Sequence, residues 1–194
     1  MRSQFWTAPN QITLLRLIFV PFVVINILDR HFKWALLLFV LAGFSDALDG
    51  LLARWLHQQS TLGQYLDPIA DKLLLSSAFL VLSFTKQIPW RYTVLVFSRD
   101  LCILLITAVL YITTSIRDFR PSIFGKLNTA AQIGAIFFVL LWRIVSAPWI
   151  GIACRVFLLA TMTFTCISGV HYCLVTGKRL HVNGHSGPPA THSH

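Results

Sequence analysis

Long apolar stretches recur along nearly the whole chain, and they constrain its fold more than any other feature. Six of them approach the roughly 20 residues that a helix needs to cross a bilayer, near residues 12–29, 34–56, 68–86, 90–113, 123–146 and 149–175. The pieces between them are short, polar or turn-forming, and too small to hold a soluble domain. We therefore predict an all-α integral membrane fold, a six-transmembrane-helix bundle with both termini on one side.

The charge balance supports a membrane protein and limits its partners. The chain is 56% hydrophobic and only 12% charged, whereas soluble domains carry about 25% charged residues. Its formal net charge of +9 is explained by basic residues at the cytosolic ends of the membrane helices and by their contact with anionic lipid headgroups. Because the basic residues are scattered between apolar stretches, they do not predict nucleic-acid binding.

The chain is predicted to contain one domain followed by a tail. We assign residues 1–180 to the membrane domain, and residues 181–194, rich in His, Gly, Pro and Ser, to a disordered tail. The four cysteines show no metal-ligand spacing and are expected to be reduced packing residues. Residues 1–11 lack the apolar run of a removable signal peptide.

Four aspartates lie close together in the sequence. Asp46 and Asp49, spaced i, i+3, share one face of a helix. Asp67 and Asp71, spaced i, i+4, share a face of the next helix, which we expect Pro68 to start. A link of roughly ten residues permits an antiparallel arrangement, so the two carboxylate pairs can converge.

Converging carboxylates at membrane depth repel one another and require cations between them. An oxygen-only ligand set favours two divalent ions, Mg²⁺ or Mn²⁺, and the absence of His and Cys argues against zinc. Two such ions can bridge a pyrophosphate, which indicates phosphoryl-type transfer. Small Gly50 and Ala53 let a nucleotide approach the helix, although small residues also serve helix packing in lipid, and Arg54 can bind a phosphate.

The full spacing is Asp46-x2-Asp49-Gly50-x2-Ala53-Arg54-x8-Gly63-x3-Asp67-x3-Asp71. This pattern resembles the complete signature of the CDP-alcohol phosphatidyltransferase family. The resemblance implies that Asp46 and Asp67 bridge both metals, Asp49 completes one site, and Asp71 completes the other and is the general base. It also implies a homodimer.

The resemblance further implies a substrate and its contacts. The donor would be CDP-diacylglycerol, whose phosphatidyl group passes to an alcohol with release of CMP at the cytosolic face. We expect a multi-pass protein of the bacterial inner membrane, with an organelle membrane as the alternative. The residues assigned to CDP binding are Asn10, Thr13, Gly50, Ala53, Arg54, Ser60 and Gly63. Segments 9–16, 62–72 and 125–132 are similar to the branch holding phosphatidylglycerophosphate and cardiolipin synthases.

The acceptor is predicted from three cations within or beside the apolar stretches, Arg16, Arg99 and Lys126. A phosphate-bearing acceptor would use them, but Arg99 can instead pair with Asp100, and Lys126 can extend to the interface. We place glycerol 3-phosphate narrowly first, because segments 9–16 and 125–132 resemble phosphatidylglycerophosphate synthases. Asp100 and Asn128 depart from that group and favour the alternative, a cardiolipin synthase that uses phosphatidylglycerol.

Two other classes of protein also place carboxylates in membrane helices. A cation transporter would explain the aspartates but not the small residues and Arg54 on the same face. A membrane scaffold would use polar residues only to join helices, so loss of Asp71 would leave no biochemical trace. Release of CMP from CDP-diacylglycerol distinguishes the enzyme from both.

Overall fold

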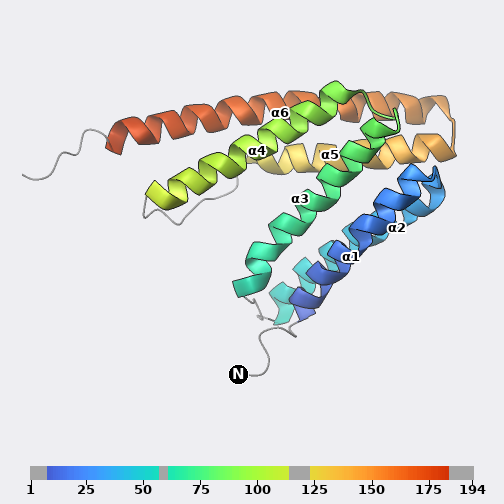
Figure 1. The fold of residues 1–194 in the computed structure, drawn as a ribbon, viewed down its shortest axis with the longest axis horizontal. Helices are drawn as coiled ribbons and strands as arrows, with labels where there is room; N and C mark the ends of the chain where they lie inside the picture. The colour runs from blue at the N-terminus through green and yellow to red at the C-terminus, as the bar shows by residue number, and fades with distance from the viewer. Residues whose placement is uncertain (1–7, 57–60, 114–122, 184–194) are drawn as a thin grey trace, which may run out of the picture.

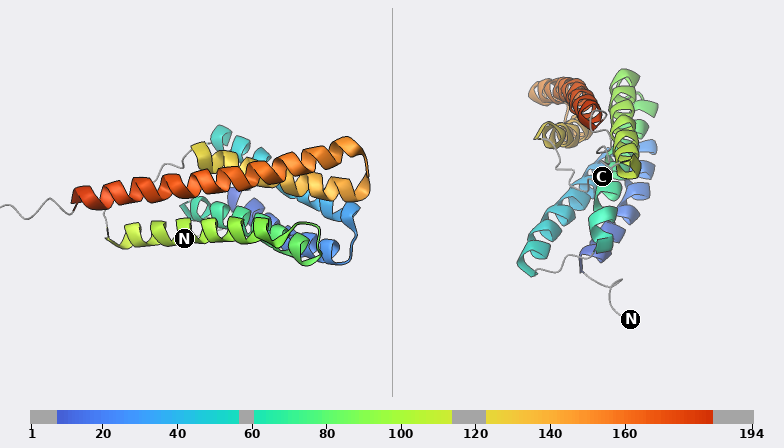
Figure 2. Two further views of the ribbon diagram at one scale, coloured as in Figure 1. Left: turned by 90° about the horizontal axis from the view of Figure 1, so that it is seen from above. Right: turned by 90° about the vertical axis from the view of Figure 1, so that its left-hand side faces the viewer.

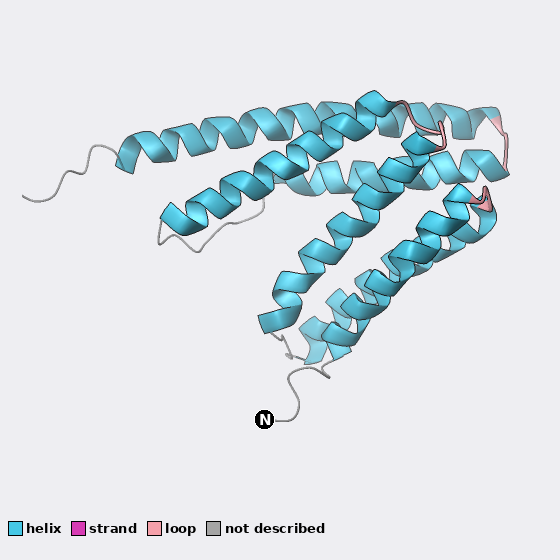
Figure 3. Cartoon of the chain, viewed as in Figure 1, coloured by secondary structure: helices cyan, strands magenta, loops and turns pink. Residues whose placement is uncertain are grey.

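The structure, a computed structural model, describes residues 8–56, 61–113 and 123–183, with side chains for residues 17–45, 70–102 except Asp71, 105 and 125–169. These residues form helices and turns and contain no strand (Figures 1 and 3). The helices are α1 (Ala8–Leu28), α2 (Phe32–Leu56), α3 (Thr61–Phe84), α4 (Trp90–Thr113), α5 (Ile123–Ile144) and α6 (Pro148–Asn183). The all-α prediction is confirmed.

Two of the tight turns between helices are closed by the same hydrogen-bond pattern. After α1, the Arg30 N–H donates to Ile27 O at 3.1 Å and the His31 N–H donates to Asn26 O at 2.8 Å. This is a Schellman motif, which satisfies the last carbonyls of a helix and needs a left-handed residue. Arg30, with φ of 59°, takes that position, and Lys86, with φ of 60°, takes it after α3. Both helices therefore end within a single turn.

The helices pack as an antiparallel bundle around one apolar core. Helix α1 packs against α2 and α3, α5 pairs along its length with α6, and α4 packs against α3 and α6. Figures 1 and 2 show the short turns 29–31, 85–89 and 145–147 at one end of the bundle, which we call the turn end. The largest fully buried side chains of the core include Ile27, Phe79, Leu82, Ile136 and Leu140.

Two helices are long and apolar enough to cross a membrane within the described residues. These segments are Gly125–Ile144 and Pro148–Gly169, and shorter apolar segments occupy Leu17–Leu28, Phe32–Ser45 and Lys72–Phe84. Exposed tryptophans lie beside all three turns of the turn end, namely Trp34, Trp90, Trp142 and Trp149. Tryptophan is enriched where a bilayer meets water, so these residues mark the turn end as an interfacial region.

The helix boundaries differ from the predicted ones at two places. Helix α3 begins at Thr61, so the prediction that Pro68 starts it was wrong, and the link to α2 is shorter than predicted. A proline inside a helix removes one backbone hydrogen bond, a loss that neighbouring groups in a membrane bundle can compensate. Helix α6 has 36 residues, a length of about 54 Å at 1.5 Å per residue, and it continues to Asn183, past the predicted start of the tail.

Candidate active site

The four aspartates lie on two consecutive helices. Asp46 and Asp49 belong to the C-terminal half of α2, and Asp67 and Asp71 belong to the N-terminal half of α3. These halves lie at the end of the bundle opposite the turn end (Figure 1). The helical spacing within each pair is confirmed, whereas the four side chains lie outside the described ones, so their convergence stays a prediction.

Most of the residues assigned to CDP lie on the first three helices. Asn10 and Thr13 lie on α1, Gly63 lies on α3, and Gly50, Ala53 and Arg54 lie on α2. Helix α1 packs against both α2 and α3. Ser60 and the side chains of the other assigned residues lie outside the described part, and their contacts with CDP remain predictions.

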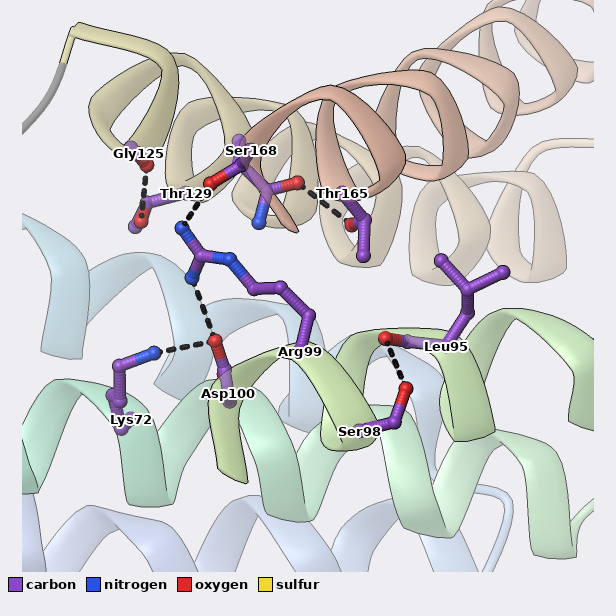
Figure 4. Close-up of polar contacts among 10 residues, drawn as sticks. Lys72, Leu95, Ser98, Arg99, Asp100, Gly125, Thr129, Thr165 and Ser168 are labelled. Carbon is purple, nitrogen blue, oxygen red and sulfur yellow. Dashed lines mark hydrogen bonds and ion pairs between the residues drawn. The ribbon is translucent and has the colours of Figure 1, made fainter. Parts of the chain in front are cut away.

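A charged network adjoins the aspartates. Lys72, which follows Asp71 on α3, places its Nζ 2.5 Å from Oδ1 of Asp100 on α4. The same oxygen accepts a hydrogen bond of 2.7 Å from Nη1 of Arg99. Figure 4 shows Arg99 reaching on from α4 to α6, where its Nη2 donates to the Ser168 hydroxyl at 2.9 Å. Three helices are thus joined through one guanidinium and one carboxylate, both buried.

A second buried contact lies one helical turn away on α6. The Thr165 hydroxyl donates to Oδ1 of Asn128 on α5 at 2.9 Å (Figure 4). Thr165 and Ser168, spaced i, i+3, lie on the same face of α6. Arg99 and Asn128 are therefore held by adjacent turns of one helix face, which brings α4 and α5 to the same stretch of α6.

Three nitrogen atoms in this region have no hydrogen-bond partner among the described residues. They are Nε of Arg99, Nδ2 of Asn128 and Nε2 of Gln132, and all three are buried. Each is a hydrogen-bond donor, and a buried donor without a partner is costly. The region can therefore accept a group that is rich in oxygen.

The three cations predicted to bind the acceptor have different positions. Arg99 pairs with Asp100, as the alternative interpretation held, and its Nε has no hydrogen-bond partner among the described residues. Lys126 is exposed on α5, and the side chain of Arg16 lies outside the described ones. Thr129 bonds to the carbonyl of Gly125 in its own helix at 3.1 Å, and Gln132 is buried.

Sequence reasoning missed Lys72, Thr165 and Ser168 as members of this network. Lys72 directly follows a motif aspartate, a position that gave no reason to single it out. Thr165 and Ser168 lie in an otherwise apolar helix, a pattern that predicts only a membrane span. One signal was available: polar residues spaced i, i+3 within a long apolar helix commonly bond across to a neighbouring helix.

The fold and the acidic helix pairs define a helical membrane protein with a candidate site for metal-bound phosphate chemistry at one end of its bundle. The model of the CDP-alcohol phosphatidyltransferase family matches residues 6–168. The chain belongs to this family.

Curated relatives come from two branches. The chain is 34% identical to the human cardiolipin synthase (CMP-forming), over 82% of this chain and 57% of the relative. It is 35% identical to the probable phosphatidylglycerophosphate synthase of Mycobacterium tuberculosis (strain CDC 1551 / Oshkosh), over 88% of this chain and 82% of the relative. It is 32% identical to the CDP-diacylglycerol--glycerol-3-phosphate 3-phosphatidyltransferase of Bacillus subtilis (strain 168), over 84% and 92%. The chain thus spans little more than half the length of the human relative.

Proposed function

We propose that this chain transfers a phosphatidyl group from CDP-diacylglycerol to the hydroxyl of an alcohol and releases CMP. The observation that carries the proposal is the family match over residues 6–168. It is supported by the place of the acidic pairs, which lie on consecutive helices, in the C-terminal half of α2 and the N-terminal half of α3. The names of relatives in both branches describe transfer of this kind.

The proposed reaction is a displacement at phosphorus. The oxygen of the acceptor hydroxyl forms a bond to the phosphorus that carries diacylglycerol, and the bond from that phosphorus to the oxygen of CMP breaks. CMP leaves with the electron pair of this bond. The carboxylate of Asp71 takes the hydroxyl proton, as the family resemblance implies.

The aspartates suit two divalent cations, which we propose as Mg²⁺ or Mn²⁺. Asp46, Asp49, Asp67 and Asp71 offer only carboxylate oxygens, the donors that these ions prefer. No other group of three or more possible ligands occurs among the described side chains. When bound, the ions would supply positive charge against the pyrophosphate.

We also propose that all six helices cross the membrane and that the chain forms a homodimer. Large apolar side chains are exposed on the described parts of α1 to α6, for example Phe22, Leu37, Leu80, Val94 and Val156. Lipid is a suitable environment for such a surface. The aspartate end would face the cytosol, in a bacterial inner membrane, and cysteine labelling from each side of the membrane tests this topology.

Two acceptors are candidates, glycerol 3-phosphate and phosphatidylglycerol. The B. subtilis relative is named for the first, and the human relative is named a cardiolipin synthase. Both acceptors carry a phosphate and a free hydroxyl, so both agree with a cationic acceptor site. Arg16, Arg99 and Lys126 are the proposed acceptor contacts.

The test is CMP release by the purified full chain with CDP-diacylglycerol, Mg²⁺ and each acceptor in turn. We expect Asp71→Asn to lower the rate at least about 100-fold, the usual size of a general-base contribution. Asp29→Asn is the matched control, because Asp29 lies in the turn after α1 at the far end of the bundle. A cation transporter would release no CMP, and equal rates for Asp71→Asn and the control would refute the proposal.

A further inference from the structure

Arg99, Asn128 and Gln132 form a group that we call the donor cluster. Their exposed fractions are 9%, 0% and 3%, and each has a side-chain nitrogen without a partner in the described structure. All three atoms donate hydrogen bonds and none accepts one. Native proteins rarely leave buried donors unpaired. The donor cluster therefore has the chemistry of a site for an anionic oxygen group.

The contacts of the donor cluster place its members close together. Arg99 bonds to Ser168, and Asn128 bonds to Thr165, one turn earlier on α6. Gln132 follows Asn128 by four residues, so it lies on the same face of α5. Arg99 from α4 and Asn128 from α5 thus meet consecutive turns of α6, and Gln132 lies one turn further along α5.

The net charge around the donor cluster is smaller than the charge of Arg99 and its neighbour Lys72 together. Arg99 and Lys72 both bond to the single carboxylate of Asp100, at 2.7 and 2.5 Å. Among these three residues the sum of formal charges is therefore +1. A ligand with one negative charge neutralises this net charge of +1. A ligand with two negative charges would leave one of them without a cationic partner in this network.

The flanks of the donor cluster are apolar and exposed. Leu101 follows Asp100 on α4, and its exposed fraction is 59%. Ile167 precedes Ser168 on α6, and its exposed fraction is 41%. In a membrane these side chains would contact acyl chains, which places lipid within one residue of Asp100 on α4 and of Ser168 on α6.

On this basis, and resting on the proposed function, we propose that the donor cluster binds the phosphate of the acceptor. We further propose that Asp100 determines specificity, because by neutralising one of two cations it selects a singly charged lipid phosphodiester over a doubly charged phosphomonoester. Phosphatidylglycerol represents the first class and glycerol 3-phosphate the second. The free glycerol hydroxyl of the lipid would form the new bond to phosphorus as CMP departs.

The first experiment needs no variant. The purified full chain is given CDP-diacylglycerol and Mg²⁺ in micelles, with phosphatidylglycerol or glycerol 3-phosphate, and kcat/KM is measured from CMP release. We expect the larger value with phosphatidylglycerol. If glycerol 3-phosphate gives the larger value, the specificity inference fails and the proposed function stands. If neither acceptor releases CMP, the proposed function itself fails.

Two variants test the residues. Asp100→Asn keeps the size of the side chain and raises the charge sum to +2, so we expect the ratio of the two kcat/KM values to move toward glycerol 3-phosphate by about tenfold. Asp29→Asn should leave the ratio unchanged. Gln132→Leu should raise the KM for the acceptor and leave the KM for CDP-diacylglycerol unchanged. An unchanged ratio in folded Asp100→Asn, or equal effects of Gln132→Leu on both KM values, would overturn the inference.

Discussion

Gly134→Ala should destabilise the contact of α5 with α6, because an aromatic ring occupies the space that a methyl group would need. A Cβ placed at Gly134 would lie 2.3 Å from both Cδ1 and Cε1 of Phe157. Carbon atoms in favourable contact are at least about 3.5 Å apart, so the ring would have to move by roughly 1.2 Å. Movement of the ring would disturb its stack on Phe138, where 5.0 Å separates the ring centroids.

The magnitude follows from two opposing effects. Overpacking of a filled site costs about 1–3 kcal/mol, while replacing a helical glycine by alanine gains about 1 kcal/mol. Gly43 supplies the matched control, since no described atom lies within 4 Å of a Cβ built there. Both variants gain the same helix propensity, so their stabilities should differ by the packing cost alone, about 1–3 kcal/mol.

Gly151 makes the comparison a graded series. A Cβ at Gly151 would lie 3.3 Å from the ring of Trp142, a tight contact that a small shift relieves. Thermal unfolding in detergent should rank the variants with Gly43→Ala most stable, Gly151→Ala intermediate and Gly134→Ala least stable. For a chain of this size, 1 kcal/mol corresponds to about 2–4 °C in Tm. If Gly134→Ala melts with Gly43→Ala or above it, the packing argument is wrong.

Three further results are expected. Arg30→Gly relieves a left-handed residue with φ of 59° and should raise the unfolding free energy by about 1 kcal/mol; a lower Tm would contradict this. Ser83 and Thr93 share a buried hydrogen bond between α3 and α4, so Ser83→Ala should lower stability by about 1 kcal/mol, and the loss should shrink in a Thr93→Val background in a double-mutant cycle. Removal of divalent ions with EDTA should abolish CMP release and added Mg²⁺ or Mn²⁺ should restore it; a rate unaffected by EDTA would exclude the proposed metal site.

The helix ends show where local patterns suffice and where they do not. The apolar stretches predicted the turns after α1 and α3 to within a few residues, because polar residues break each stretch there. They did not predict the start of α3 at Thr61. The sequence prediction placed the start at Pro68, because proline is common in the first turn of helices. Ser60, a residue type favoured as an N-cap, was the available signal for the earlier start.

The amino-acid sequence alone predicted six helices, no strand among the described residues, and the helical register of each aspartate pair. These features depend on periodicity along the chain, which is a local property. The pairing of Lys72 with Asp100 and of Thr165 with Asn128, in contrast, is established only by the packing of the helices. These partners lie on different helices, and packing of the bundle selects them because most buried polar groups are stable only when hydrogen-bonded.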